Sequence, residues 1–235
     1  MRGAIWYQGE SNGGEGIHYL PKLKGLVNGW REVWDQPEDF PFYFYVVKLA
    51  QYHQPNDNPG GGDGFARIRV AQDRIQELPH TGVASAIDIG NASDIHPKNK
   101  QDVGKRLARW ALRDVHGKDA VVSGPTFKLM KVEGSTAVIS FDHLGGGLMV
   151  ASKEATAATV ETPGAELKRF AICGEDRKWQ WATATIEGDT VKVSADGVSA
   201  PVAVRYAYSS NPEGANLYNK AGLPAIPFRT DKWNP

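Results

Sequence analysis

The sequence has one cysteine, no excess of charge and no long apolar run, and each of these absences excludes a class of protein. Cys173, the single cysteine among 235 residues, rules out an intramolecular disulfide framework and a cysteine-rich metal site. The 27 acidic and 27 basic side chains cancel, so no long-range field favours nucleic acid or an anionic membrane. No apolar run has the length of a membrane-spanning helix, and Met1 and Arg2 lead into a predicted strand rather than a signal peptide. We therefore expect neither a nucleic-acid partner nor a membrane partner.

Motifs for metal and phosphate binding are also missing. The sequence has no HExxH, no paired CxxC and no EF-hand spacing, so we expect no metal and no cofactor. The glycine-rich run GGGDG at residues 60–64 lacks the lysine and the serine or threonine of a P-loop. This composition favours a flexible linker.

The first half of the chain alternates strand and helix patterns. Apolar runs at residues 4–8, 41–49 and 83–89 are typical of strands, and helical spacing of apolar residues follows each run, at 20–34, 65–78 and 97–116. Pro97 suits the first turn of the last helix. The alternation predicts a parallel sheet with helices on both faces. Ligands bind beyond the carboxyl ends of such strands, which here means loops 8–16, 51–64 and 90–96.

The pattern changes at about residue 119, where short β-rich runs replace helical spacing. These runs cover residues 126–132, 137–141, 167–173, 181–186, 190–193 and 202–208. Gly188 and Asp189 separate two of them as a two-residue hairpin loop does. The pattern predicts a β-sandwich over residues 119–235, ending in an extended tail, after an α/β domain over residues 1–118.

Two predicted loops carry residues suited to hydrolysis. His96, in the segment DIHP after the third strand, is placed to act as a general base, with Asp94 two positions before it. The segment QGESN at residues 8–12 follows the first strand. Its side-chain amides and backbone N–H groups can hold the oxyanion of a tetrahedral intermediate, each donor contributing on the order of 3 kcal/mol.

Three separated blocks carry a family resemblance. They are WYQGESN at residues 6–12, DIGNASDIHPKNKQDVGKRLARWAL at 88–112 and NLYNKAGLPAIPFRTDKW at 216–233. In this order, and running nearly end to end, the chain resembles the carboxyl-terminal portion of the sialate O-acetylesterase family of SGNH hydrolases. The resemblance implies a partial flavodoxin-like sheet with a β-domain, and a serine esterase that removes acetyl groups from carbohydrate hydroxyls. It also implies an exported protein, periplasmic, extracellular or lysosomal, although this chain contains no signal peptide.

The resemblance also implies roles for individual residues. His96 corresponds to the catalytic base, and a helix starting at Pro97 would favour its neutral form. Asp94 is expected to orient the ring, although the wider pattern has the acid three positions before the histidine, where Ser93 stands. Asp88 or a backbone carbonyl is the alternative. His53, on the second loop, either touches substrate or is an exposed loop histidine.

The block at residues 8–12 corresponds to the family segment beside the acyl group. Gln8, Gly9, Ser11 and Asn12 are expected to face the reacting acetyl group or its oxyanion. Glu10 is expected to brace the loop through hydrogen bonds rather than to transfer a proton.

The family's nucleophilic block, resembling GDS or GQSN, does not occur in this chain. We therefore expect an incomplete esterase whose partner is a missing amino-terminal segment of the same enzyme. One alternative is an autonomous hydrolase, because residues 9–13 fit the G-x-S-x-G pattern with Ser11 as nucleophile. Another is a non-catalytic carbohydrate-binding fragment, with Trp179 and Trp181 of the β-domain either stacking on sugars or filling the sandwich core.

Overall fold

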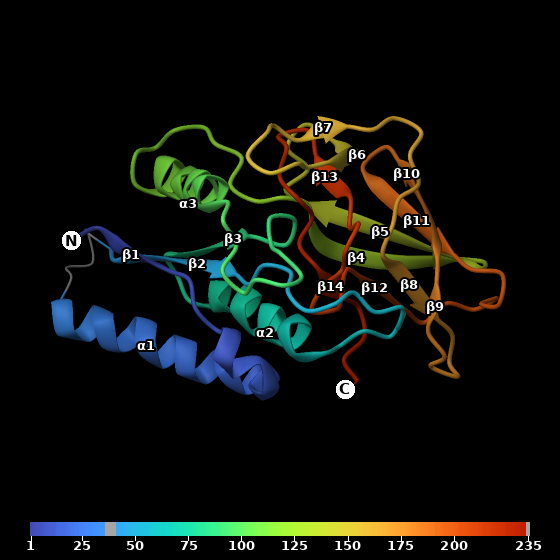
Figure 1. Ribbon diagram of the computed structural model, residues 1–235, viewed down its shortest axis with the longest axis horizontal. Coiled ribbons are helices and arrows are strands. Elements are labelled where there is room, and N and C mark those ends of the chain that lie inside the picture. The colour runs from blue at the N-terminus through green and yellow to red at the C-terminus, as the bar shows by residue number, and fades with distance from the viewer. Residues whose placement is uncertain (36–40, 234–235) are drawn as a thin grey trace.

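A three-stranded parallel sheet organises the first half of the chain in the computed structural model, which describes residues 1–35 and 41–233 (Figure 1). Its strands β1 (Gly3–Trp6), β2 (Tyr43–Lys48) and β3 (Thr81–Ser85) lie in that order. The continuous apolar run predicted for the second strand fits its central position, because both of its faces are buried.

Helices cover the two faces of this sheet (Figure 1). On one face lie α1 (Tyr19–Trp34) and α2 (Gly64–Asp73), which share a core cluster with Phe44 and Val46 of β2. On the other face lies α3 (Lys100–Asp114), which packs on Tyr45 and Val47. Two 3-10 segments, η1 (Glu10–His18) and η2 (Arg74–Glu77), precede α1 and follow α2. In the described part of the chain, no helix is both long and apolar enough to cross a membrane.

The third helix begins later than its sequence pattern predicts. Its first residue is Lys100, and Asn99 caps it by accepting a hydrogen bond from the backbone N–H of Asp102 (3.1 Å). The Asn99 side chain accepts a hydrogen bond from a backbone N–H of the first helical turn, which a proline side chain cannot do. The helix therefore starts after Asn99 and not at Pro97. His96 therefore lies four positions before the first residue of the helix, and not directly beside it.

The second half consists of antiparallel sheets. One four-stranded sheet has the order β10-β11-β5-β4, a second has the order β14-β12-β8-β9, and a three-stranded sheet has the order β13-β6-β7. Their bounds are β4 (Thr126–Glu133), β5 (Thr136–Asp142), β6 (Leu148–Ser152), β7 (Val160–Glu161), β8 (Phe170–Cys173), β9 (Gln180–Trp181), β10 (Thr183–Glu187), β11 (Thr190–Ser194), β12 (Ala203–Tyr206), β13 (Leu217–Asn219) and β14 (Phe228–Arg229). The predicted mixed α/β architecture is confirmed: a parallel sheet is followed by antiparallel ones.

The two four-stranded sheets share one apolar core. Ile139 and Val191 come from the first sheet, and Ile172 and Val204 from the second. The predicted hairpin at Gly188 and Asp189 is confirmed, because Glu187 pairs with Thr190 across it. The tail, predicted to be extended, includes β13 and β14, which pair with β6 and β12.

Close packing joins the two halves. The glycine-rich segment at residues 60–64, predicted to be a flexible linker, lies against the end of β12, with the Gly62 N–H bonded to the Tyr208 carbonyl (2.7 Å). A Cβ at Gly61 would lie 1.8 Å from that same carbonyl oxygen, so only glycine permits this approach. The prediction of a linker is wrong because its glycines serve close backbone packing.

Candidate active site

The loops after the three parallel strands meet at one edge of the sheet, as the sequence predicts. Tyr7, Tyr52 and Ile95, one from each loop, join the same apolar cluster. The Lys100 ammonium lies 5.0 Å from the centre of the Tyr7 ring, which ties the start of α3 to the end of β1. The segments that carry Gln8, His53 and His96 therefore occupy the same end of the sheet.

Gln8 is held by hydrogen bonds from three directions. Its Nε2 donates to Oδ1 of Asn12 (2.8 Å), and its Oε1 accepts from the Tyr19 hydroxyl (2.8 Å). Its backbone carbonyl accepts from Nε2 of Gln72 (3.0 Å). These bonds fix the orientation of the Gln8 amide and leave its second amide hydrogen free to donate elsewhere.

Gly9 and Asn12 shape the turn that follows. Gly9 has φ 140°, and a Cβ there would meet Nε2 of Gln72 at 3.1 Å. Asn12 Nδ2 donates to Glu15 (2.8 Å), whose other oxygen pairs with Lys22. The bracing contacts expected of Glu10 are thus made by Glu15, while the Glu10 carboxylate has neither hydrogen bond nor ion pair within the described residues.

The first N–H groups of η1, at Glu10 and Ser11, have no acceptor inside that segment, as is general for the start of a helix. With the free hydrogen of Gln8, they give residues 8–11 three potential donors just after β1. Such a set suits a developing negative charge on oxygen.

His96 is almost fully solvent-accessible and has an acid beside it. Its side chain is 86% exposed, and its Nδ1 lies 3.6 Å from Oδ1 of Asp94. The same Asp94 oxygen accepts a hydrogen bond from the His96 backbone N–H (2.9 Å), and Asn91 Oδ1 accepts from the N–H groups of Ser93 and Asp94. Asp94 is therefore held beside the Nδ1 side of the ring, with Nε2 left open.

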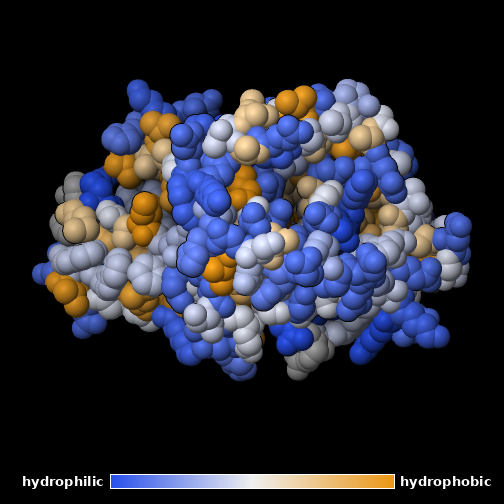
Figure 2. Space-filling model, viewed as in Figure 1, coloured by the Kyte–Doolittle hydropathy of each residue, from blue (hydrophilic) through white to orange (hydrophobic). Residues whose placement is uncertain are grey.

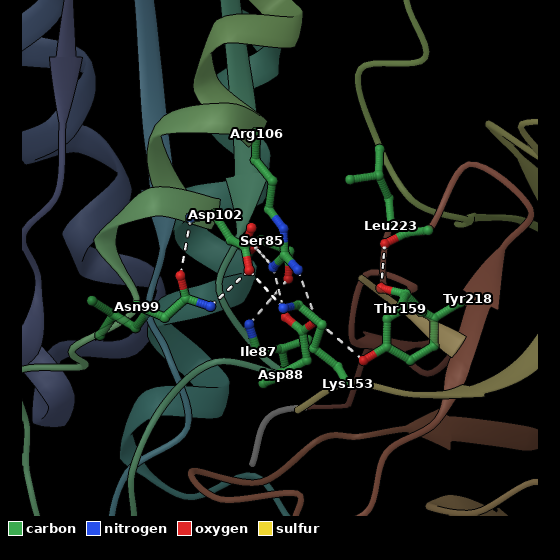
Figure 3. A network of polar contacts seen from close by, with 12 residues as sticks. Ser85, Ile87, Asp88, Asn99, Asp102, Arg106, Lys153, Thr159, Tyr218 and Leu223 are labelled. Carbon is green, nitrogen blue, oxygen red and sulfur yellow. Dashed lines mark hydrogen bonds and ion pairs between the residues drawn. The ribbon is translucent and has the colours of Figure 1, made fainter. Parts of the chain in front are cut away.

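Asp88 does not face His96. Its two oxygens accept from the Arg106 guanidinium at 2.6 and 2.8 Å, and Oδ2 also accepts from the Tyr218 hydroxyl at 3.1 Å (Figure 3). Both charged side chains are nearly buried. The alternative that Asp88 orients His96 is wrong, because the Asp88 carboxylate is occupied by Arg106 and Tyr218.

Ser11 lacks the features of a nucleophile elbow. That motif places the serine on a sharp, strained turn next to a base. Ser11 is exposed, has no positive φ, and makes no hydrogen bond to a histidine of the described chain. The G-x-S-x-G match at residues 9–13 therefore lacks the local structure that gives the motif its meaning.

The loop after β2 is fixed to the β-rich half. His53 is exposed with φ 75°, and its ring is tilted against that of Tyr52, with 4.2 Å between ring centres. Its carbonyl accepts a hydrogen bond from Asn211 Nδ2 (2.7 Å). Beneath it, the buried Arg69 donates to the carbonyls of Leu49, Ala50, Ser209 and Ser210 at 2.7 to 2.8 Å. Burial lowers the pKa of Arg69 to about 9, so this residue stays charged at neutral pH.

Sequence reasoning missed Arg69, Arg106 and Tyr19, which hold these loops in place. Tyr7, next to Gln8, is also enclosed, and burial and then the charge of Glu10 raise its pKa to about 12. It therefore remains a neutral hydroxyl. Arg69 and Arg106 could have been found because each is a charged residue on the apolar side of a predicted helix.

A cavity of about 300 Å³, lined by both polar and apolar residues, lies between the two halves, beside the end of β3. Gln51, Asp88, Lys153, Asn216 and Tyr218 contribute to its wall. It lies next to the start of the His96 loop, because a Cβ at Gly90 would lie 2.2 Å from the Gln51 carbonyl oxygen. Trp179 and Trp181 do not belong to the shared core, and Trp181 is 42% exposed, so the alternative that they fill the core is wrong.

Comparison with known proteins gives matches among solved structures. The chain matches no known protein family and no curated protein. Among solved structures, it is similar to a crystal structure described as a novel carbohydrate acetylesterase from Xanthomonas citri, with a TM-score of 0.86 and 40% sequence identity. The similarity covers 99% of this chain and 51% of the Xanthomonas protein. The chain thus spans about half the length of that enzyme.

Proposed function

We propose that this chain is the base-bearing half of a carbohydrate O-acetylesterase of the sialate O-acetylesterase type, with a flavodoxin-like sheet and a β-sandwich. The observation that carries the proposal is the exposed His96, with Asp94 at its Nδ1, on the same sheet edge as the donors of residues 8–12. The likeness to the Xanthomonas acetylesterase supports the same chemistry.

In this mechanism His96 moves a proton in two directions. Nε2 accepts the proton of a serine hydroxyl as the serine oxygen bonds to the acetyl carbon. Asp94, whose Oδ1 lies 3.6 Å from Nδ1, stabilises the imidazolium through its negative charge. When the tetrahedral intermediate collapses, the bond to the sugar oxygen breaks and Nε2 returns the proton to that oxygen. A water molecule then hydrolyses the acetyl-serine by the same steps.

The carbonyl oxygen of the acetyl group becomes negative during each attack. The N–H groups of Glu10 and Ser11 and the free hydrogen of Gln8 are the donors assigned to it, each contributing on the order of 3 kcal/mol. The cavity beside Gln51 and Asn216 is assigned to the hydroxyl groups of the departing sugar.

The nucleophile is assigned to a segment outside this chain, because the sequence has no block resembling GDS or GQSN and Ser11 has no base beside it. The natural partner is then the amino-terminal part of the same enzyme, and the substrate is an acetylated carbohydrate.

The test is hydrolysis of 4-nitrophenyl acetate by the purified chain, alongside the variants Ser11→Ala and His96→Ala. A folded wild-type chain should release 4-nitrophenol no faster than either variant does. Activity that disappears in both variants would instead make the chain a self-sufficient hydrolase with Ser11 as nucleophile.

A further inference from the structure

A groove of about 510 Å³ lies between α3 and the segment that joins β6 to β7, where the two halves of the chain meet. Small side chains, those of Thr156, Ala157 and Gly222, form part of its wall. On the face of the molecule that Figure 2 shows, hydrophilic residues are interspersed with apolar ones over α3 and β7. The groove therefore suits a polar ligand.

Positive charge gathers in this groove, although the charges of the whole chain cancel. Its lining includes two carboxylates, Asp102 and Glu161, and five basic side chains: Lys105, Arg106, Arg109, Lys153 and Lys220. Asp88, which pairs with Arg106, supplies a third carboxylate from behind the wall. Five positive charges against three negative ones leave an excess of two, and such a local excess attracts anions.

Three of the basic side chains keep N–H groups for a ligand. The Lys105 side chain is 64% exposed and lies 3.4 Å from Asp102. Arg109 bonds to a backbone carbonyl and makes no ion pair within the described residues. Lys220 pairs with Glu161, and its side chain is 41% exposed. An ammonium has three donors and a guanidinium has five, so each of the three can still donate to a carboxylate.

Contacts between α3 and the segment after β6 hold the groove in shape (Figure 3). The Lys153 side chain, only 5% exposed, pairs with Asp102 of α3 at 2.6 Å. Its Nζ also donates to the carbonyls of Ala155 and Ala157, at 2.7 and 2.6 Å. Asn99, the cap of α3, donates to the same Ala155 carbonyl (2.7 Å). The groove is therefore preformed, which lowers the entropy cost of binding a ligand in it.

The groove adjoins the cavity that is assigned to the departing sugar. Lys153 contributes to the walls of both. The ion pair of Asp88 and Arg106, 2.6 Å apart, also separates them, because Asp88 lines the cavity and Arg106 lines the groove. A carbohydrate longer than one unit can therefore occupy both, with one sugar in the cavity and a linked sugar in the groove.

We propose that the groove binds a uronic acid unit of the substrate, linked to the sugar that carries the acetyl group. This inference rests on the proposed function, and it makes the substrate an acidic oligosaccharide or polysaccharide. The uronate carboxylate lies among Lys105, Arg109 and Lys220. A volume of about 510 Å³ is much larger than a compact inorganic anion needs, and it accommodates a sugar ring.

The experiment measures binding of trigalacturonate to the full chain by isothermal titration calorimetry. Maltotriose is the uncharged trisaccharide for comparison, and sodium sulfate is the compact anion. The variants are Lys105→Gln, Lys220→Gln and the double variant, which remove positive charge from the groove. Lys128→Gln is the matched control, because the Lys128 side chain is 59% exposed and pairs with Asp142 in the β4–β5 hairpin. Circular dichroism confirms that each variant is folded.

We expect trigalacturonate to bind at least about tenfold more tightly than maltotriose or sulfate. Each single variant should weaken its binding about threefold and the double variant about tenfold, because each exposed charge pair contributes a modest share. Lys128→Gln should bind as the wild type does. A folded wild-type chain that does not bind trigalacturonate, equal affinity for maltotriose or sulfate, or an effect of Lys128→Gln as large as that of Lys105→Gln would each overturn the proposal. If the chain binds trigalacturonate as expected but hydrolyses 4-nitrophenyl acetate through Ser11, the groove is supported and the proposed function is contradicted.

Discussion

Asp88 and Arg106 have side chains only 4% and 6% exposed, so this ion pair lies in the interior of the protein. Removing one partner leaves a buried charge without compensation. Arg106→Met should therefore lower the free energy of unfolding by about 3–5 kcal/mol, measured by urea denaturation. The double variant Asp88→Asn and Arg106→Met keeps an acceptor for the Tyr218 hydroxyl and should lose clearly less. Equal losses in both variants would show that packing, not the unpaired charge, sets the cost.

Asp102 links α3 to β6 through Lys153 at 2.6 Å (Figure 3). Burial opposes ionisation of this carboxyl, but the hydrogen bonds from Lys153 and Asn99 outweigh burial and lower its pKa. A folded-state pKa below the unfolded value of about 3.9 adds stability at neutral pH, and this stability is lost as pH falls through the folded pKa.

Asp102→Asn should consequently lower the melting temperature more at pH 7 than at pH 3. The control is Asp142→Asn, which removes an exposed pair with Lys128 and should change the melting temperature little at either pH. A destabilisation by Asp102→Asn that is the same at both pH values would contradict the role assigned to its charge.

The sequence predicted individual site residues where a short motif contains side chains suited to hydrolysis. The segments around Gln8 and His96 could be recognised because each follows a strand and contains groups suited to hydrolysis. Asp88 was misjudged, and Arg69 and Arg106 were missed, because their contacts join residues up to 141 positions apart, as between Arg69 and Ser210. Such pairs cannot be predicted from the local sequence pattern.

At the scale of elements, the loop that carries His96 depends on Gly90. A Cβ there would lie 2.2 Å from the Gln51 carbonyl oxygen and 2.7 Å from the Gln51 backbone nitrogen. Neither atom can move away unless the loop after β2 shifts. Gly90→Ala should lower the free energy of unfolding by about 1–3 kcal/mol and speed hydrogen exchange across residues 91–96.

The matched substitution is Gly29→Ala in the middle of α1, where a Cβ would meet nothing within 4 Å. It should stabilise the chain by roughly 0.5–1 kcal/mol. If the melting temperatures of both variants are higher than that of the wild type, or both are lower, the packing assigned to Gly90 is contradicted.

Element types were predictable from periodicity more readily than their ends. The alternation of strands and helices in the first half was confirmed, because each apolar face is long and regular. The start of α3 was misplaced because the Asn99 cap outweighs the preference of Pro97 for a first turn. β7 and β14, two residues each, were not predicted, since strands so short have no period and depend on their partners.

At the scale of the whole molecule, Arg69 connects the two halves through four backbone carbonyls. Replacing it by methionine removes this donor from all four carbonyls, and only the Ser210 carbonyl keeps a hydrogen bond from the Tyr52 N–H (3.3 Å). Arg69→Met should therefore lower the free energy of unfolding by on the order of 3–5 kcal/mol and split unfolding into two transitions. Arg69→Lys keeps the charge but reaches fewer carbonyls. Its free energy of unfolding should lie between those of Arg69→Met and the wild type. Calorimetry that gives one unchanged transition for Arg69→Met would contradict this coupling.

The division of the catalytic residues between two segments is tested most directly by covalent labelling with a fluorophosphonate, which reacts with an activated serine. The chain is labelled alone and as a pair co-expressed with an added segment, the part of the Xanthomonas acetylesterase that lies outside the similarity. Mass spectrometry locates the adduct. We predict no adduct on the isolated chain, an adduct on a serine of the added segment in the pair, and much less of it with His96→Ala. An adduct on Ser11 of the isolated chain would contradict the assignment of the nucleophile to another segment.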